Sequence, residues 1–111
     1  MIEFNDDNYL DILNKHFDNN DTVVCLISPR KSCSNCVSTI ANIEKFNSKN
    51  PDKIFFYYID YTKYDMLQSY YELTRLLEYP HSIVFYGNWE DKEFLEGVIT
   101  VRQLESILNK A

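Results

Sequence analysis

Glycine, proline and cysteine are scarce in this chain of 111 residues, which holds two Gly, three Pro and three Cys. So few Gly and Pro exclude collagen-like and low-complexity sequences. Three cysteines are too few, and odd in number, for the disulfide framework of a small secreted protein. No apolar run approaches the roughly 18 residues of a membrane-spanning helix, and the acidic residues 1–7 are unlike a signal peptide. We therefore expect a soluble, cytoplasmic protein without a membrane partner.

Basic residues are also in the minority, because 11 Lys and Arg stand against 17 Asp and Glu and give a formal charge of −6. A negative chain repels phosphate backbones, so a nucleic-acid binder of this charge needs a local basic stripe. The tight basic pair beside a motif, Arg30 and Lys31, is too small for such a footprint. Nucleic acid is therefore not an expected partner.

Apolar residues are abundant and predict a packed core. Hydrophobic residues make up 45% of the chain, which includes nine Tyr and seven Phe, and this excludes a disordered linker. At about 100–200 residues per domain, residues 1–111 are expected to form a single domain. We expect that domain to be a monomer.

The hydrophobic period alternates between that of a helix and that of a buried strand. Helical spacing predicts helices over residues 6–18, 33–46 and 64–77. Apolar runs predict strands over residues 22–27, 54–59 and 82–86, and residues 93–96 are expected to form a short partner strand after a turn. Thr100 and Gln103 have the spacing of a capping box, which predicts a final helix. The order predicts an α/β protein in three layers, with a mixed central β-sheet flanked by helices.

Several local features refine this prediction. Gly87 and Asn88 predict a hairpin-like turn, and Gly97 indicates a bulge or a close backbone approach. Trp89 is expected to cap the sheet edge, and Asp60 to act in turn or cap chemistry. The apolar spacing of the second helix runs through Cys36, Val37, Ile40, Ile43 (or Ala41) and Phe46. The tyrosines either form an exposed patch or pack within the fold, and His16 is expected at the surface or half-buried.

The motif Cys33-Ser34-Asn35-Cys36 joins a predicted strand to a predicted helix. Residues three apart on a helix lie nearly one turn apart, so both sulfurs reach one side. Free N–H groups and the positive end of the helix dipole favour a thiolate at Cys33 in the first turn. Arg30 and Lys31 add positive charge to the same effect. The predicted chemistry is attack by Cys33 on a disulfide, followed by resolution by the less exposed Cys36.

Other interpretations of the cysteines stay open at this point. The pair could be half of a zinc site, although Cys25, His16 and His81 are not at ligand spacing to it. It could also be two inert buried residues. Cys25 lies inside an apolar run and is expected to fill the core rather than act as a third redox thiol. His81 either approaches the cysteines and tunes them or faces solvent.

Taken together, these motifs resemble the thioredoxin-like family over nearly the whole chain. The resemblance rests on the strand before Cys33 and Cys36, on Tyr79 and Pro80 leading into a later strand, and on Gly97 before the last helix. It implies a thioredoxin-like fold and thiol–disulfide exchange with protein disulfides. It further implies that the chain needs no cofactor or metal and that a separate reductase or thiol pool recycles it.

The same resemblance implies a cis peptide bond between Tyr79 and Pro80, packed against the cysteines, with Tyr79 in contact with substrate. A cis bond is inexpensive only before proline. A trans Pro80 that begins an edge strand is the plain alternative.

Some features depart from the family pattern. The chain lacks the Trp before the first cysteine and the Pro between the two, and residues 24–27 contain no carboxylate. The segment between Asp60 and Pro80 is also longer. These departures support an alternative function, that of a thioredoxin-like binding module or accessory subunit without redox catalysis.

Overall fold

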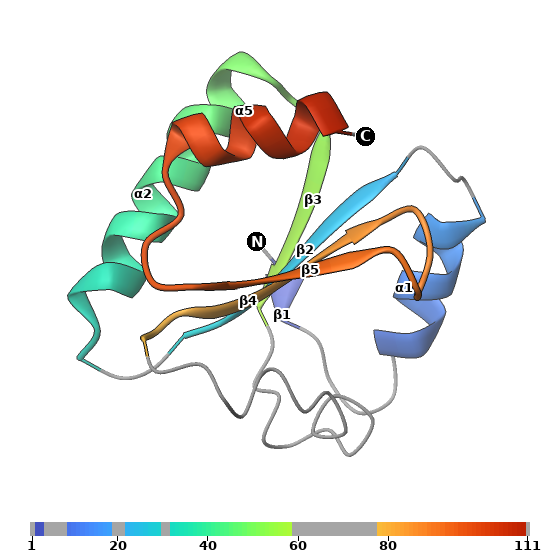
Figure 1. Ribbon diagram of the computed structural model, residues 1–111, viewed down its shortest axis with the longest axis horizontal. Coiled ribbons are helices and arrows are strands. Elements are labelled where there is room, and N and C mark those ends of the chain that lie inside the picture. Colours follow the sequence, from blue (N-terminus) through green and yellow to red (C-terminus); the bar gives the residue numbers. More distant parts are fainter. Residues whose placement is uncertain (1, 4–8, 19–21, 30–31, 59–77, 111) are drawn as a thin grey trace.

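A mixed β-sheet forms the centre of the computed structural model, which describes residues 2–3, 9–18, 22–29, 32–58 and 78–110 (Figure 1). Its five strands lie in the order β1-β3-β2-β4-β5. They are β1 (Ile2–Glu3), β2 (Val23–Ser28), β3 (Ile54–Tyr58), β4 (His81–Tyr86) and β5 (Lys92–Glu96). The pairs β1–β3 and β3–β2 are parallel, whereas β2–β4 and β4–β5 are antiparallel. The predicted α/β class with a mixed sheet is confirmed.

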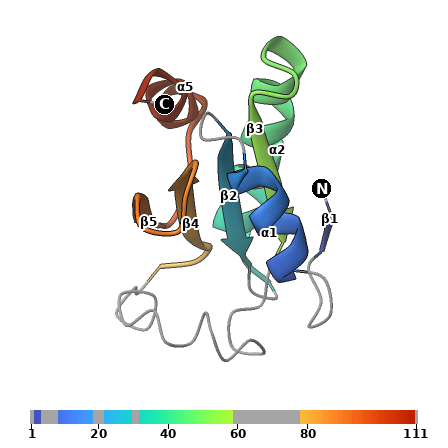
Figure 2. The same ribbon diagram turned by 90° about the vertical axis from the view of Figure 1, so that its right-hand side faces the viewer.

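Helices cover both faces of this sheet. The described helices are α1 (Tyr9–Phe17), α2 (Ser34–Lys49) and α5 (Val101–Lys110). Figures 1 and 2 show α2 and α5 on one side of the sheet and α1 on the other. None of these described helices is long and apolar enough to cross a membrane.

Strand β2 forms the middle of the core because its six residues are all buried. Successive side chains of a strand point to opposite faces. Val24 and Leu26 accordingly join the cluster under α1, whereas Val23, Cys25 and Ile27 join the cluster under α2 and α5. A strand that is buried on both faces reads as a continuous apolar run, which is why the sequence predicts it well.

Trp89 lies against α1 and does not cap the sheet edge, so that prediction is wrong. Its ring meets Phe17 and Phe85 edge-on, at centroid distances of 5.0 and 5.6 Å. Its Nε1 donates a hydrogen bond to Asn14 Oδ1 at 3.0 Å. Trp89 lies within a tight turn in which Asn88 Oδ1 accepts hydrogen bonds from the backbone N–H groups of Glu90 and Asp91.

His16 of α1 is half-buried, as the sequence predicts. Its Nε2 and the hydroxyl of Tyr57 are hydrogen-bonded at 2.6 Å, and its ring packs on that of Phe55 with the ring centroids 4.5 Å apart. Burial lowers the pKa of His16. Tyr57 itself is buried, so this tyrosine packs within the fold and does not belong to an exposed aromatic patch.

The buried face of α2 differs from the predicted one. It consists of Cys36, Thr39, Ile43 and Phe46, whereas the side chain of Val37 is 69% exposed. The buried Thr39 hydroxyl accepts a hydrogen bond from the Ile99 N–H at 3.1 Å, which satisfies both groups inside the protein. A prediction from apolar spacing places Val37 in the core and leaves Thr39 out. It cannot foresee that a polar side chain is buried because its hydroxyl is hydrogen-bonded there.

The start of α5 is held by the predicted capping box. The Gln103 N–H donates to Thr100 Oγ1 at 3.1 Å, and the Thr100 N–H donates to Gln103 Oε1 at 2.8 Å. Asn42 Nδ2 also donates to the Ile99 carbonyl at 2.9 Å. Two side chains of α2, Thr39 and Asn42, thus hold the backbone of the residue that precedes Thr100.

Strand β1 is an element that the sequence does not predict. It has two residues and pairs with the edge of β3, which is too short a segment to show alternation. The helix predicted over 64–77, the first residues of the helix predicted over 6–18, and Asp60 lie outside the described residues.

Replacing Thr39 with valine tests the link between α2 and α5. The change leaves the buried Ile99 N–H without its acceptor, and an unpaired buried donor costs about 1–3 kcal/mol. We expect Thr39→Val to lower the free energy of unfolding in urea by that amount. Thr39→Ser keeps the hydroxyl and should cost only about 1 kcal/mol for the lost methyl group. Equal losses in the two variants would contradict this account.

Candidate functional site

Cys33 and Cys36 form a disulfide at the beginning of α2, with their Cα atoms 5.2 Å apart. Cys33 is the residue that caps the helix, with an extended backbone, and the helix itself begins at Ser34. The predicted helix start is therefore one residue early, and its predicted end at Phe46 is three residues short of Lys49. The two thiols that a zinc site would need are bonded to each other.

The sulfur of Cys33 occupies the place of an N-cap oxygen. It accepts a hydrogen bond from the Cys36 N–H at 3.0 Å. The N-terminus of a helix offers unpaired N–H groups and a partial positive charge, and both stabilise a negative sulfur more than a neutral one. The N–H donor and the partial positive charge of the helix N-terminus thus favour a thiolate at Cys33 once the disulfide is reduced.

The two cysteines differ in exposure. Cys33 is half-buried, whereas Cys36 is only 5% exposed and faces the sheet. Disulfide exchange requires access to the attacked sulfur, so Cys33 is the one that a second protein can reach. Ser32 before it has a φ of 54°, which turns the chain sharply into the helix. Arg30 and Lys31 lie outside the described residues, so their effect on the thiolate stays a prediction.

The peptide bond between Tyr79 and Pro80 is cis, which rules out the alternative of a trans proline. The strand register places this bond at the end of the sheet where β2 stops, because His81 pairs with Ser28, the last residue of β2. The chain continues from Ser28 to Cys33, so the cysteines lie at the same end. Figure 1 shows the start of β4 and the start of α2 at that same end. Within the described part of the chain, segments distant in sequence thus meet at one place.

Gly97 fastens this segment. Its N–H lies 3.1 Å from the Pro80 carbonyl and 3.3 Å from the Glu78 carbonyl. Its φ of +75° suits glycine, and a Cβ at this position would stand 2.7 Å from Glu78 Oε2. The close backbone approach predicted for Gly97 is therefore confirmed, although Gly97 follows β5 and does not interrupt it.

Tyr79 stacks on His81, with ring centroids 4.0 Å apart and planes 14° from parallel. Tyr79 is half-buried, whereas His81 is 3% exposed and so does not face solvent. Strand alternation puts His81 on the same face as Ile83 and Phe85, which is the face that α1 covers. His81 therefore does not lie under α2 with Cys36.

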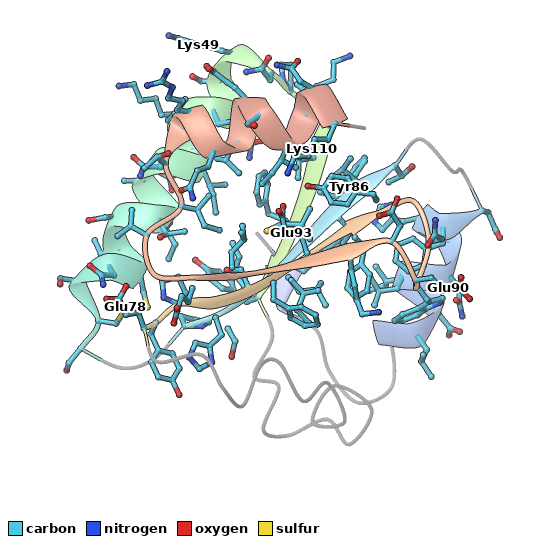
Figure 3. All side chains as sticks on the ribbon, in the orientation of Figure 1. Lys49, Glu78, Tyr86, Glu90, Glu93 and Lys110 are labelled. Carbon is cyan, nitrogen blue, oxygen red and sulfur yellow. A yellow bond between two sulfur atoms is a disulfide. The ribbon has the colours of Figure 1, made fainter. Side chains whose placement is uncertain are left out.

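Two features of the site were missed by sequence reasoning. Glu78 precedes the Tyr-Pro pair, and its N–H donates to a Glu96 carboxylate oxygen at 3.2 Å. Figure 3 shows Glu78 at the end of the sheet that carries the sulfur atoms. Val37, which follows Cys36 directly, presents an apolar side chain to solvent. The position of Glu78 beside Tyr79 was the signal that could have drawn attention to it.

Cys25 lies two positions before Ile27 on β2 and is fully buried. Burial raises the pKa of its thiol to about 12, so it stays protonated near neutrality. Strand β2 itself contains no carboxylate. Across the described residues, no three His, Cys, Asp or Glu side chains come together in a way that could hold a metal ion.

Comparison with known proteins identifies the fold. No family model and no curated protein matches the sequence. Among solved structures, a chloroplastic thioredoxin z matches with a TM-score of 0.74 and 12% identity, over 99% of this chain and 92% of that one. A thioredoxin of Schistosoma mansoni matches with a TM-score of 0.66 and 21% identity, over 98% and 95%.

A thioredoxin of Fasciola hepatica is also similar, with a TM-score of 0.63 and 12% identity over 91% of each chain. At such low identities these matches establish the fold and nothing finer. The predicted thioredoxin-like fold is confirmed, and within it this chain carries a disulfide at Cys-x-x-Cys spacing.

Alkylation tests the assignment of Cys25 to the core. We expect iodoacetamide, at mildly alkaline pH, to label the reduced native protein at Cys33 while Cys25 stays unlabelled, because its thiol is buried and protonated. Mass spectrometry after digestion locates the label, and concentrated urea serves as the control that exposes Cys25. Labelling of Cys25 at the same rate as Cys33 in the native protein would contradict the assignment.

Proposed function

We propose that this protein of thioredoxin-like fold is a thiol–disulfide oxidoreductase whose reduced Cys33/Cys36 dithiol exchanges with disulfides of other proteins. The observation that carries the proposal is the hydrogen bond from the Cys36 N–H to Cys33 Sγ at 3.0 Å, at the N-cap of α2. A sulfur in that position is favoured as a thiolate, and the thiolate is the form that attacks disulfides.

The reaction consists of two exchanges. The Cys33 thiolate attacks one sulfur of a substrate disulfide, forms a mixed disulfide, and releases the other substrate sulfur as a thiolate that takes up a proton. The Cys36 thiol then gives its proton to water and attacks Cys33 Sγ, which releases the second substrate sulfur as a thiolate that also takes up a proton. The substrate disulfide has gained two electrons and two protons, and Cys33 and Cys36 have become a disulfide.

Tyr79 and Pro80 are proposed to bind the substrate chain next to this mixed disulfide. Two observations support the role: the half-buried Tyr79 ring, and the end of the sheet that β4 shares with the start of α2. Fastening of the Pro80 carbonyl by the Gly97 N–H gives the segment a fixed shape. A fixed backbone lowers the entropy that is lost when a partner binds.

The proposal includes a partner that regenerates the active form. The protein acts as a monomer in the cytoplasm, where a separate reductase or a thiol pool returns Cys33 and Cys36 to the dithiol form. In a reducing compartment the pair rests as a dithiol and the protein acts as a reductase. The net charge of −6 supports proteins rather than nucleic acids as substrates.

Reduction of insulin by dithiothreitol tests the proposed function. We expect the native protein to accelerate insulin reduction, and Cys33→Ser to fall to the rate of dithiothreitol alone because the attacking sulfur is gone. Cys36→Ser should retain the first exchange and accumulate a mixed disulfide that is visible by mass spectrometry without reductant. Cys25→Ala is the matched control, since it removes a cysteine outside the pair and should keep full activity.

Two results would contradict the proposal. One is equal acceleration by the native protein and Cys33→Ser. The other is a native protein without activity in which Cys33 also fails to react with small disulfides. In either case the binding module or accessory subunit becomes the better function, and its surface would include the exposed Val37.

A further inference from the structure

Ser82 on β4 has a buried hydroxyl with no evident use in the folded core. The residue is 0% exposed, and its Oγ has no hydrogen-bond partner among the described residues. A hydroxyl that is removed from water without a partner costs free energy, so such groups are uncommon and call for a reason. Alanine or valine would fill a purely structural position at lower cost.

The strand register places Ser82 under the beginning of α2. Ser82 pairs directly with Ile27 across the β2–β4 ladder, and paired residues project on the same face of a sheet. Ile27 and Val84, two residues along β4, both belong to the cluster under α2 and α5. Helix α2 begins at the end of the sheet that carries Ile27 and extends toward the opposite end. Its later residue Phe46 packs on Phe56, and Phe56 pairs with Cys25, which lies farther from that end than Ile27 does.

The sheet-facing side chain in the first turn of α2 is Cys36, followed one turn later by Thr39. The Thr39 hydroxyl oxygen already has a partner, because it accepts a hydrogen bond from the Ile99 N–H. Ile27, which faces the helix from β2, is apolar. Among the described residues, the hydroxyl that the disulfide form leaves buried without a partner is therefore that of Ser82.

Titratable groups near Cys36 are few among the described residues. On its own helix the nearest is Cys33, to which it is bonded. On β2 it is Cys25, which stays protonated near neutrality. On β4, His81 lies on the other face of the sheet, and the hydroxyl of Tyr86 donates to Glu93 at the opposite end of the strand. On β3, Tyr58 pairs with Ile27 and projects on the same face, and burial, together with the nearby Glu44 carboxylate, raises the pKa of its hydroxyl. From the segment before β4, the Glu78 carboxylate points at Gly97, at the exposed rim.

We propose that the Ser82 hydroxyl donates a hydrogen bond to the Cys36 thiolate during the second exchange. This inference rests on the proposed function and deepens it. Reduction or mixed-disulfide formation releases Cys36 Sγ from Cys33 and leaves it facing the sheet. When the Cys36 thiol gives up its proton to water, the Ser82 O–H stabilises the resulting anion and stays protonated itself. The Cys36 sulfur then bonds to Cys33 Sγ, the substrate thiolate leaves, and Ser82 returns to its unpaired state.

This role answers a chemical need of the site. Cys36 is 5% exposed, and burial disfavours a thiolate because it removes water from the charge. Residues Val23–Ser28 of β2 contain no carboxylate that could take up the proton. A single hydroxyl that donates to the anion lowers the cost of ionising Cys36 without adding a second charge to the core.

Single-turnover reaction with dithionitrobenzoate tests the proposal in the full-length reduced protein. The first thionitrobenzoate released reports attack by Cys33, and the second reports resolution by Cys36. For Ser82→Ala we expect an unchanged first phase and a second phase whose pH midpoint moves upward. A tenfold smaller thiolate fraction, partly offset by greater nucleophilicity, slows the second phase about threefold at neutral pH.

Ser28→Ala is the matched control, because it removes the same hydroxyl oxygen from a buried serine on β2, the neighbouring strand of the sheet. Ser28 alternates with Ile27 and so lies on the other face of the sheet. We expect the pH midpoint of the second phase to be unchanged in Ser28→Ala. An equal midpoint in Ser82→Ala and the native protein would overturn the proposal, since a purely structural role changes rates without moving that midpoint.

A second measurement separates this proposal from the proposed function. In Cys33→Ala, the Cβ chemical shift of isotope-labelled Cys36 reports its ionisation by NMR, and Cys25 does not interfere because its pKa is about 12. Adding Ser82→Ala should move the Cys36 titration to higher pH. An unmoved titration overturns the role of Ser82, whether or not the protein reduces substrates. A native protein without a first phase overturns the proposed function alone.

Discussion

The packing of α2 against the sheet is the constraint on which the rest of the site depends. One side of the helix is buried in the core, and this packing fixes where the helix begins. The buried residues are Cys36, Thr39, Ile43 and Phe46. The first N–H groups of α2, which have no partner within the helix, therefore lie just beyond the end of β2, and Cys33 Sγ accepts a hydrogen bond from one of them. A sulfur that serves as a cap is at the same time a sulfur stabilised as an anion. Folding and reactivity thus share one hydrogen bond.

A second set of contacts brings segments distant in sequence to that helix start. Gly97 holds the Pro80 carbonyl, and two residues later Ile99 is bonded to the Thr39 hydroxyl of α2. The cis proline segment, the end of β5 and the second turn of α2 are connected in this way through neutral backbone and hydroxyl groups. Charged groups, such as the carboxylates of Glu78 and Glu96, stay at the rim, where water screens them.

Much of the fold follows from the sequence because its central strands are buried on both faces. Strands β2, β3 and β4 read as apolar runs, and the capping box at Thr100 locates α5. Features that depend on tertiary contacts escape such reasoning. Thr39 is polar yet buried, Trp89 turns back onto α1, and β1 exists through its pairing with β3. Cys33 and Cys36 are visible as a motif, whereas the burial of Ser82 beneath α2 appears only once the strand register is known.

The central claim is that Cys33 and Cys36 form one reversible redox couple. Equilibration of the protein with mixtures of reduced and oxidised dithiothreitol, followed by acid quenching, alkylation and mass spectrometry, measures it directly. The account predicts a single transition between a species with the Cys33–Cys36 disulfide and a species with both thiols free, with the two-electron dependence of a dithiol. A pair that stays in one state across the whole series, or a Cys33→Ser protein with the same transition, would contradict it.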